Sequence, residues 1–394
     1  MDPRTGFPIV GMVGGGQLAR MTHQAAIALG QSLSVLAVSP DDPAAQVSPS
    51  VMFGQHTDLD ALRTFADSCD VLTFDHEHVP AEHLRVLVAE GVTVHPGPDA
   101  LVHAQDKLVM RTRLAGLGVP VPPFAPVTEV ADAVKFGDEH GWPCVLKASR
   151  GGYDGRGVWL LADPDAARAQ VATLLDAGTP LLVEQRVVMR RELAALVARS
   201  PFGQGACWPL VETVQSDGIC VEVLAPAPGL SEERAERAQE LALRVAAALD
   251  VVGVLAVELF DTDAGLVVNE LAMRPHNSGH WTIEGARTSQ FEQHLRAVLD
   301  YPLGATDALA PAVVMANVLG AATPPGMGAD ERLHHLLARY RDAHVHLYGK
   351  PERPGRKIGH VTMLGAAPAP LRERARLAAH WLSHGEWLDG YDIH

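Results

Sequence analysis

Near its N-terminus the chain has a short apolar run, Ile9 to Val13, that ends in three consecutive glycines, Gly14 to Gly16. Apolar residues then recur at helical spacing from Gln17 to Leu29. Glycine lets the backbone turn tightly between a buried strand and a helix. The pattern therefore predicts a strand, a turn and a helix, which is the opening unit of a parallel sheet.

The same alternation of β-type runs and helical patterns continues towards residue 100. The further strands and helices that it predicts are Leu33–Val38, Leu59–Phe65 (helix), Val71–Phe74, Ala81–Ala89 (helix) and Val92–Val94. Alternating β and α segments indicate a parallel sheet that is covered on both faces. We therefore expect residues 1–106 to form an N-terminal α/β domain.

The rest of the chain is expected to be mixed α+β, because short strands are joined there by glycine-rich turns. Its predicted elements are strands at 145–147, 158–161, 181–185 and 192–198, a helix at 231–249, a hairpin of strands 254–260 and 266–271, strands at 312–318, 344–348 and 360–364, and two C-terminal helices. A chain of 394 residues exceeds a single core. We expect a central domain at 107–305 and a small C-terminal domain at 306–394.

Composition restricts the possible partners and compartments. Lys and Arg number 32 against 47 Asp and Glu, and a formal net charge of −15 repels a nucleic-acid backbone. The four cysteines form no CxxC pair, which argues against a zinc or redox motif and favours a reduced, cytoplasmic setting. The longest apolar stretch, Leu241–Phe260, carries three charged residues, so no membrane span is expected.

The glycine turn after the first strand has three possible interpretations. Gly14, Gly16 and Ala19 fit the GxGxxA pattern of dinucleotide-binding turns, with Asp41 and Asp42 following at a suitable distance. Such a turn can equally hold another anionic ligand at a helix N-terminus, or serve the fold alone. The pattern by itself leaves a nicotinamide cofactor, another anion and a structural turn open.

A second glycine-rich segment, Arg150 to Val158, lies between two predicted strands and contains four glycines and two arginines. Backbone N–H groups of such a loop can close on triphosphate oxygens, and arginines add charge-assisted hydrogen bonds. Lys147 at the end of the preceding strand can reach the same phosphates. An ordinary hairpin turn is the alternative, but the segment favours a phosphate-binding lid.

Acidic and amide side chains stand in the predicted hairpin near residue 260. Glu258 lies on one strand, and Asn269 and Glu270 lie near the end of the other. Antiparallel pairing brings these positions close together, and two carboxylates with an amide oxygen suit Mg²⁺ bound together with phosphates. The polar stretch Arg274 to Trp281 follows at once and is suited to bind anions and orient a substrate. A Ser-His-Asp hydrolase is not supported, because no GxSxG motif occurs.

The order of these features resembles the nucleotide site of the ATP-grasp superfamily. Within it, four motifs are similar to those of the 5-(carboxyamino)imidazole ribonucleotide synthetases, namely GGGQLARM (14–21), GGYDGRGV (151–158), RPHNSGHWT (274–282) and RPGRKIGH (353–360). The resemblance implies an ATP-grasp fold with an N-terminal pre-ATP-grasp domain and a small C-terminal domain. The chain departs from the family pattern at Asp75-His76-Glu77-His78, at Met273 and near Gln215, where a histidine is absent.

The resemblance also implies a set of site residues. ATP would be bound by Lys107, Lys147, Gly152, Tyr153, Asp154, Gly155, Arg156, Gly157, Val158, Glu184, Gln185, Val187, Glu192, Gln215, Asn269 and Glu270. Mg²⁺ would be held by Glu258 and Glu270. The substrate 5-aminoimidazole ribonucleotide would be contacted by Gln17, Leu18, Glu77, Tyr153, Arg156, Arg274, His276, Asn277, Ser278, Lys350, Arg356 and Lys357. Catalytic roles would fall to Arg274, Asp154 and Tyr153.

The activity that the resemblance implies is carboxylation of this ribonucleotide with ATP and bicarbonate, through carboxyphosphate, with release of ADP and phosphate, by a homodimer. An ATP-grasp enzyme that activates formate is the nearest alternative. An NAD-linked oxidoreductase and a catalytically silent nucleotide sensor are the others.

Four cations, Lys350, Arg353, Arg356 and Lys357, lie within eight residues of an otherwise acidic chain. Pro351, Pro354 and Gly355 mark this segment as a loop, so exposed cations on a solvated turn are one interpretation. The other is that the cluster holds the 5′-phosphate of the substrate through charge-assisted hydrogen bonds.

Overall fold

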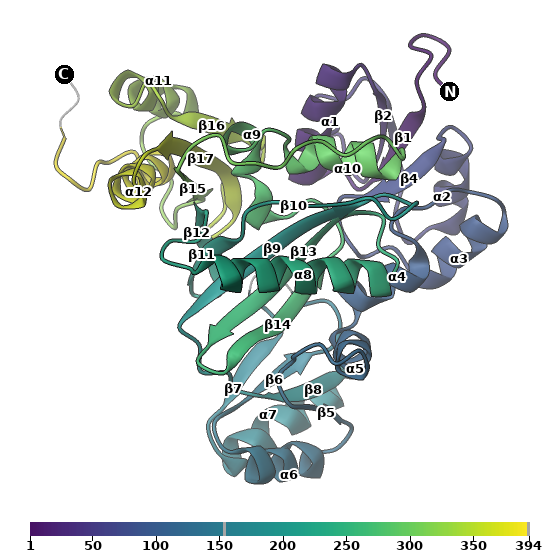
Figure 1. Cartoon of the computed structure of the whole chain (residues 1–394), viewed down its shortest axis with the longest axis vertical. Helices are drawn as coiled ribbons and strands as arrows, with labels where there is room; N and C mark the ends of the chain where they lie inside the picture. Colours follow the sequence, from purple (N-terminus) through teal and green to yellow (C-terminus); the bar gives the residue numbers. More distant parts are fainter. Residues whose placement is uncertain (153–154, 392–394) are drawn as a thin grey trace.

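The computed structural model describes residues 1–152 and 155–391 of the chain. It consists of three β-sheets with helices around them (Figure 1). A small sheet lies at one end of the long axis, and the N- and C-terminal segments lie at the other. Within the described ranges, every helix is too short or too polar to cross a bilayer.

The first sheet confirms the predicted α/β organisation. Its strands β1 (Ile9–Val13), β2 (Ser32–Ala37), β3 (Val51–Phe53) and β4 (Val71–Phe74) are all parallel and run in the order β3-β2-β1-β4. The helices that accompany them are α1 (Gln17–Leu29), α2 (Leu59–Ala66) and α3 (Ala81–Ala89).

One predicted strand of this sheet is wrong. Residues 92–94 form no strand, and Val94 makes a single bridge to Leu72. Pro96 follows two residues later and has no backbone N–H for a ladder, while Gly91 turns the chain just before at a φ of 92°. The apolar run is therefore too short to pair further.

Two helices connect the first sheet with the centre of the molecule. These are α4 (Pro98–Gln105) and α5 (Lys107–Gly116). Asp106 caps α5, because its carboxylate accepts hydrogen bonds from the backbone N–H groups of Leu108 (3.0 Å) and Val109 (3.2 Å). The cap places Lys107 in the first turn of the helix.

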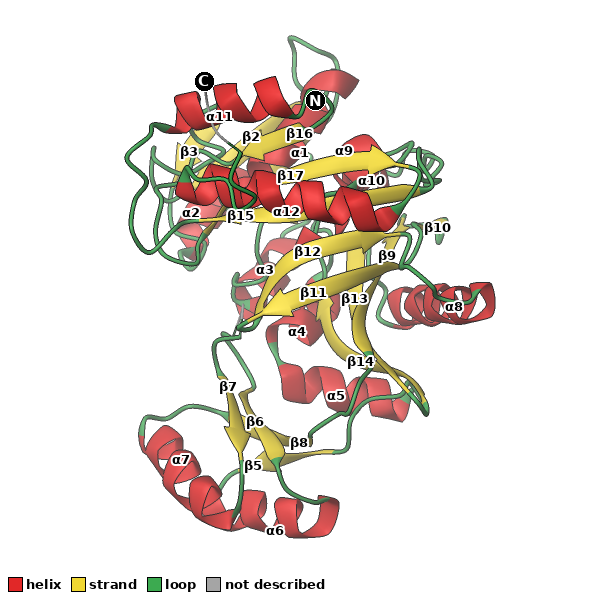
Figure 2. Ribbon diagram, turned by 90° about the vertical axis from the view of Figure 1, so that its left-hand side faces the viewer, coloured by secondary structure: helices red, strands yellow, loops and turns green. Residues whose placement is uncertain are grey.

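The small sheet is antiparallel, in the order β5-β8-β6-β7, with strands β5 (Phe124–Val127), β6 (Cys144–Ala148), β7 (Val158–Leu161) and β8 (Leu181–Gln185). Helices α6 (Val130–His140) and α7 (Pro164–Asp176) cover its outer side (Figure 2). The glycine-rich segment 149–157 joins β6 to β7, and Lys147 pairs with Val158 at its base.

The large sheet has nine strands and extends from the central segment into the C-terminal segment. Its strands are β9 (Arg191–Arg199), β10 (Gly205–Cys207), β11 (Val211–Ser216), β12 (Ile219–Ala225), β13 (Gly253–Thr262), β14 (Gly265–Ala272), β15 (Ala312–Leu319), β16 (His344–Leu347) and β17 (Lys357–Gly365). The order is β14-β13-β9-β11-β12-β15-β17-β16, with β10 beside β9. The antiparallel pair β12–β15 joins the two segments.

Strand β9 is buried on both faces, and its residues alternate between two cores. Leu193, Ala195 and Val197 pack with helix α8 (Glu232–Ala248), whereas Leu196 and its neighbours face a second cluster around Trp208. Side chains of a strand point to opposite faces in turn, so this apolar run without polar interruption requires cover on each side.

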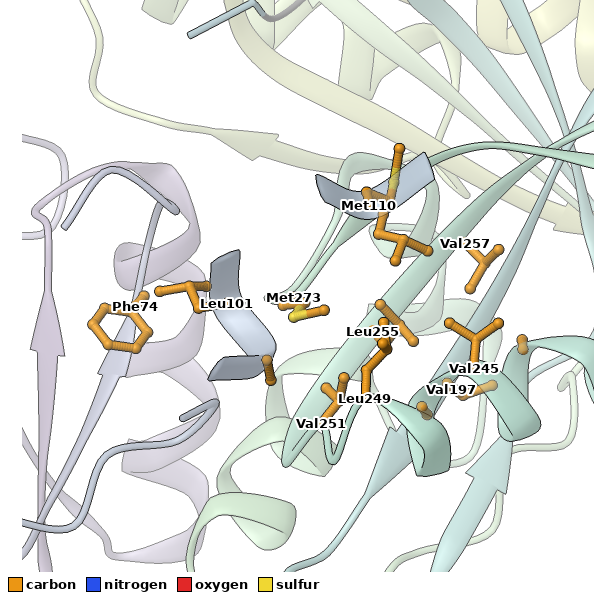
Figure 3. Packing of buried hydrophobic residues seen from close by; sticks show 14 of the residues in the cluster. Phe74, Leu101, Met110, Val197, Val245, Leu249, Val251, Leu255, Val257 and Met273 are labelled. Carbon is orange, nitrogen blue, oxygen red and sulfur yellow. The ribbon is translucent and has the colours of Figure 1, made fainter. Parts of the chain in front are cut away.

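The first sheet and the large sheet share a hydrophobic core, whereas the small sheet has a cluster of its own. One cluster runs from Phe74 of the first sheet through Leu101 and Met273 to Leu255 of the large sheet (Figure 3).

The remaining helices are α9 (Thr282–Gly285), α10 (Gln290–Val298), α11 (Ala329–Arg339) and α12 (Pro368–His384), with a 3₁₀ turn at Asn277–Gly279. Helix α10 packs on the first sheet through Leu295 and Val298. The boundaries expected at residues 106 and 305 stay predictions.

Candidate active site

A cavity of about 1180 Å³ opens where the first sheet, the hairpin β13–β14 and the loop before β17 meet. The residues of its wall that the sequence singled out are Gln17, Leu18, Glu77, Lys107, Gly152, Arg156, Glu258, Glu270, Arg274, His276, Asn277, Lys350, Arg356 and Lys357. They come from widely separated parts of the chain. Tyr153 and Asp154 lie outside the described residues.

The glycine turn before α1 is closed by a carboxylate of the chain itself. Asp75 accepts hydrogen bonds from the backbone N–H groups of Gly16 (2.7 Å) and Ala19 (2.9 Å). A Cβ on Gly16 would lie 2.2 Å from Asp75 Oδ2, so glycine is needed for this close approach. An acid that already occupies these donors argues against a pyrophosphate at the helix N-terminus. The turn meets the cavity through Gln17 and Leu18 instead.

The two predicted metal ligands are direct cross-strand neighbours. Glu258 of β13 pairs with Glu270 of β14, and the register shifts between Glu258 and Leu259, so that Asn269 is an extra residue on its strand. A bulge of this kind lets two successive side chains lie towards one site. Asn269 Nδ2 donates to Glu258 Oε2 at 3.2 Å, and Lys107 Nζ donates to Glu270 Oε1.

This pair concentrates negative charge. Burial, together with the carboxylates of Glu270 and Glu192, raises the pKa of Glu258 to about 7. No group of three or more His, Cys, Asp or Glu side chains gathers to hold a metal within residues 1–152 and 155–391. Two carboxylates fit Mg²⁺, which commonly completes its coordination with phosphate oxygens and water.

Lys147 is held in place by a buried carboxylate. Its Nζ contacts Glu184 Oε2 at 2.8 Å and donates to Asn269 Oδ1 at 3.3 Å. Glu184 Oε1 accepts from Arg111 Nε at 2.6 Å, and both partners of this contact are buried. Burial would raise the pKa of Glu184, but the cations Lys147 and Arg111 lower it. The carboxyl group of Glu184 thus orients a lysine, and Arg111 is a member of the site that the sequence did not indicate.

The other predicted nucleotide residues lie on the small sheet, on the large sheet and on the connection between them. Glu192 is hydrogen-bonded by Gln215, and burial raises its pKa. Val187 is half-buried in the connection from β8 to β9. The side-chain amide of Gln185 donates to the carbonyl oxygen of His140 at 3.2 Å, and the expected place of Gln185 beside the adenine stays a prediction.

The glycines of the expected lid are required for two reasons, namely a positive φ at some positions and a lack of space for a Cβ at another. Gly155 and Gly157 adopt φ values of 75° and 74°, in the region that favours glycine. A Cβ on Gly152 would lie 2.7 Å from the carbonyl oxygen of Arg156. These glycines are therefore needed for the path of the loop itself, and Arg156 reaches the cavity wall from it.

The polar stretch after β14 lines the cavity and is held by Glu77 of the loop after β4, by Asn317 of β15 and by a contact within the stretch itself. Arg274 Nε donates to Glu77 Oε2 at 2.7 Å. The side-chain amides of Asn277 and Asn317 of β15 donate to each other at 3.0 and 2.8 Å. Ser278 is buried, and its hydroxyl lies 2.8 Å from His276 Nδ1.

His276 is neutral in this setting. Burial, with Arg274 and Lys357 nearby, lowers the pKa of His276 to about 3. Its Nδ1 accepts from the Ser278 backbone N–H at 3.3 Å, so its Nε2–H faces Glu258 Oε1 at 3.5 Å. The contact with Glu258 is therefore a long polar contact and not an ion pair.

The loop that carries the C-terminal cations contacts helix α1 and the loop between β2 and β3. Lys350 Nζ donates to Gln17 Oε1, and the carbonyl oxygen of the neighbouring Gly349 accepts from Gln46 at 2.9 Å. Arg353, Arg356 and Lys357 also line the cavity. The solvated-turn interpretation does not account for a loop that is docked on another segment and faces a shared cavity.

Some residues of the cavity wall had no ligand of their own assigned from the sequence, among them Asp75, His76, His78, Arg150 and His280. Arg150 and His280 lie in the two segments expected to bind phosphates or substrate, namely 150–158 and 274–281. Asp75, His76 and His78 belong to the stretch 75–78, which departs from the family pattern. The sequence showed where these residues stand along the chain, but not that they line one cavity.

Lys147 of the small antiparallel sheet lies close to the acidic hairpin of the large sheet, which carries Glu258 and Glu270. This combination defines an ATP-grasp ligase. Family models match as the ATP-grasp domain (residues 112–291), the ribonucleotide synthetase preATP-grasp domain (8–105) and the phosphoribosylaminoimidazole carboxylase C-terminal domain (313–374). The expected ATP-grasp fold is confirmed.

Curated relatives and solved structures agree with each other. The N5-carboxyaminoimidazole ribonucleotide synthases of Mycobacterium bovis and Corynebacterium ammoniagenes are 67% and 49% identical, over 98% of this chain and 90% and 94% of theirs. The synthetase structure from Thermus thermophilus has a TM-score of 0.85 at 40% identity, covering 97% of this chain and 100% of that one. A synthase from Aspergillus clavatus in complex with ADP and 5-aminoimidazole ribonucleotide has a TM-score of 0.85 at 33% identity, covering 95% and 98%.

This chain belongs to the N5-carboxyaminoimidazole ribonucleotide synthase family. The expected membership is confirmed, and the chain is an ATP-dependent ligase of purine biosynthesis. A NAD-linked oxidoreductase is thereby excluded.

Proposed function

We propose that this ligase carboxylates 5-aminoimidazole ribonucleotide with ATP and bicarbonate, giving the N5-carboxyamino product, ADP and phosphate. The observation that carries the proposal is a single cavity whose wall contains the Glu258–Glu270 pair, the Arg274–His280 stretch and the cations of residues 350–357. The acidic pair suits a nucleoside triphosphate bound with Mg²⁺, and the polar stretch with the cations suits a small anionic substrate. A homodimer and a cytoplasmic location stay predictions.

In this scheme bicarbonate oxygen attacks the γ-phosphorus of ATP, the bond to the β-phosphate oxygen breaks, and carboxyphosphate and ADP form. The exocyclic amine of the ribonucleotide then bonds to the carboxyl carbon, phosphate leaves and the amine loses a proton. Phosphoryl transfer needs mainly positioning and charge stabilisation, which Lys107, Lys147 and Arg274 supply. Mg²⁺ held by Glu258 and Glu270 would neutralise charge on the phosphates.

The test is phosphate release from MgATP, measured with and without 5-aminoimidazole ribonucleotide and bicarbonate. We expect strong release only when both are supplied. Formate with glycinamide ribonucleotide is the control for the formate-activating alternative, and equal turnover with that pair would overturn the proposal.

The cation cluster gives a second, sharper test. We expect Arg356→Ala to raise the KM for the ribonucleotide about tenfold, because the loss of one charge-assisted hydrogen bond to a phosphate is worth roughly this factor. The KM for ATP should stay nearly unchanged. The measurement is steady-state phosphate release at varied concentrations of each substrate.

Arg341→Ala is the matched control for this variant, because Arg341 is an exposed arginine of the same segment outside the cavity wall. It should change neither KM. If Arg356→Ala behaves like this control, another group holds the 5′-phosphate.

A further inference from the structure

A buried glutamine outside the expected site organises the polar stretch 274–281. Gln290 is the first residue of α10 and is 0% exposed. Its Oε1 accepts from the backbone N–H of His276 at 2.8 Å, and its Nε2 donates to the carbonyl oxygen of His276, also at 2.8 Å. The same Nε2 lies 2.9 Å from His280 Nδ1. One amide therefore ties together the backbone of one histidine and the ring of another.

The backbone of His276 fixes which end of the amide is which. A peptide N–H can only donate and a carbonyl oxygen can only accept, so the oxygen and nitrogen of the Gln290 amide cannot be exchanged. The amide nitrogen carries only donors, so His280 Nδ1 must accept. The ring proton of neutral His280 is therefore on Nε2. Burial keeps this ring neutral, since it places the pKa of His280 well below its usual value.

The Nε2–H of His280 has no hydrogen-bond partner among the described residues, although the residue is fully buried. His280 lies in the wall of the cavity. The neighbouring ring of His360, 5.1 Å away between centroids, is held at Nδ1 by the Tyr348 hydroxyl at 2.7 Å. A buried donor without a partner is costly unless a ligand or water satisfies it.

We propose that Gln290 is a positioning residue of the ribonucleotide subsite, which presents the Nε2–H of His280 as a donor to an acceptor oxygen of the bound ribonucleotide. The proposal rests on the proposed function, because it takes the 274–281 stretch as part of that subsite. Gly279 belongs to the same arrangement, since a Cβ there would lie 2.3 Å from Gln290 Oε1. The stretch can follow its path only with glycine at this position.

Gln290→Glu tests the arrangement with almost no change of shape. A carboxylate has no N–H, so both donations, to His276 O and to His280 Nδ1, are lost. We expect kcat/KM for the ribonucleotide to fall about tenfold or more, with the KM for ATP within about twofold of wild type. Long-range ¹H–¹⁵N spectra should show His280 protonated at Nε2 in the wild type and at Nδ1 in the variant, because a carboxylate at residue 290 requires a donor.

Gln293→Glu is the matched control on the same helix. Gln293 is also 0% exposed. Its Nε2 donates to the carbonyl oxygen of Gly304 at 2.8 Å, and its Oε1 accepts from the backbone N–H of Gly304 at 2.7 Å. It should lower the melting temperature to a similar degree without changing either kinetic constant or the His280 spectrum. An equal loss of kcat/KM for the ribonucleotide in both variants would show that Gln290 serves only the fold, and it would overturn the proposal.

Wild-type measurements separate this proposal from the function on which it rests. A wild-type enzyme that releases no phosphate in response to the ribonucleotide would refute the proposed function. A responsive wild-type enzyme with His280 protonated at Nδ1 would refute only the role of Gln290, and this spectrum needs no variant to fold. An unchanged kcat/KM for the ribonucleotide in a folded Gln290→Glu protein would also refute only the role of Gln290.

Discussion

Replacing Glu270 by Gln should lower kcat by about 10³-fold while the protein stays folded. The amide keeps the size of the side chain and the cross-strand pairing with Glu258. It removes one of two carboxylates proposed to hold Mg²⁺, and it also removes the anionic partner of Lys107. The loss therefore falls on the charge that must be stabilised during phosphoryl transfer.

Phosphate release, thermal unfolding and Mn²⁺ binding measured by electron paramagnetic resonance form the experiment. Glu212→Gln is the control, because Glu212 lies in the same sheet and pairs with Arg191 at 3.2 Å outside the cavity wall. It should keep wild-type turnover and metal affinity. A folded Glu270→Gln protein with full activity would exclude Glu270 as a metal ligand.

Replacing Lys147 by Met should lower kcat/KM for ATP by about 100-fold, the value of one or two charge-assisted hydrogen bonds to phosphate. The ammonium of Lys147 is nearly buried and is fixed by Glu184 and Asn269, so its direction is set before a nucleotide binds. The KM for the ribonucleotide should change little. Titration calorimetry with ADP and steady-state kinetics measure the two effects.

Two companion variants make this result specific. Lys135→Met, at an exposed lysine of α6, should leave all constants unchanged. Lys147→Met combined with Glu184→Gln should be less stable than Lys147→Met alone, because it leaves the buried guanidinium of Arg111 without its anionic partner, and ATP affinity should stay low. If Lys147→Met folds and uses ATP as the wild type does, Lys147 serves the fold and not the nucleotide.

Strands and helices with a clear period were predictable from the sequence. The first strand and helix, the strand at 71–74 and the hairpin near residue 260 follow their apolar patterns, because each pattern reflects a local face that must be buried. The strand predicted at 92–94 is wrong, because only Val94 of this short apolar run pairs with a neighbouring strand.

Side-chain direction at the site could not be read in the same way. The sequence placed Glu258, Asn269 and Glu270 near one another, but the bulge that lets the last two act together is a property of strand register. Arg111 and Gln290 gave no signal at all. Arg111 contacts Glu184, 73 residues further along the chain, and Gln290 contacts the 274–281 stretch through a fold of the chain that no residue pattern marks.

The sequence by itself determined the class of the protein, the closeness of the acids Glu258 and Glu270 and the four motifs of its family, because these depend on residue types at short spacing. Only the tertiary structure decided that the C-terminal strands continue the large sheet through β12 and β15, that Asp75 fills the helix N-terminus behind the glycine turn, and that Lys350 docks on Gln17. Such contacts join residues tens to hundreds of positions apart. Their formation depends on register and packing across the whole chain, which no local pattern encodes.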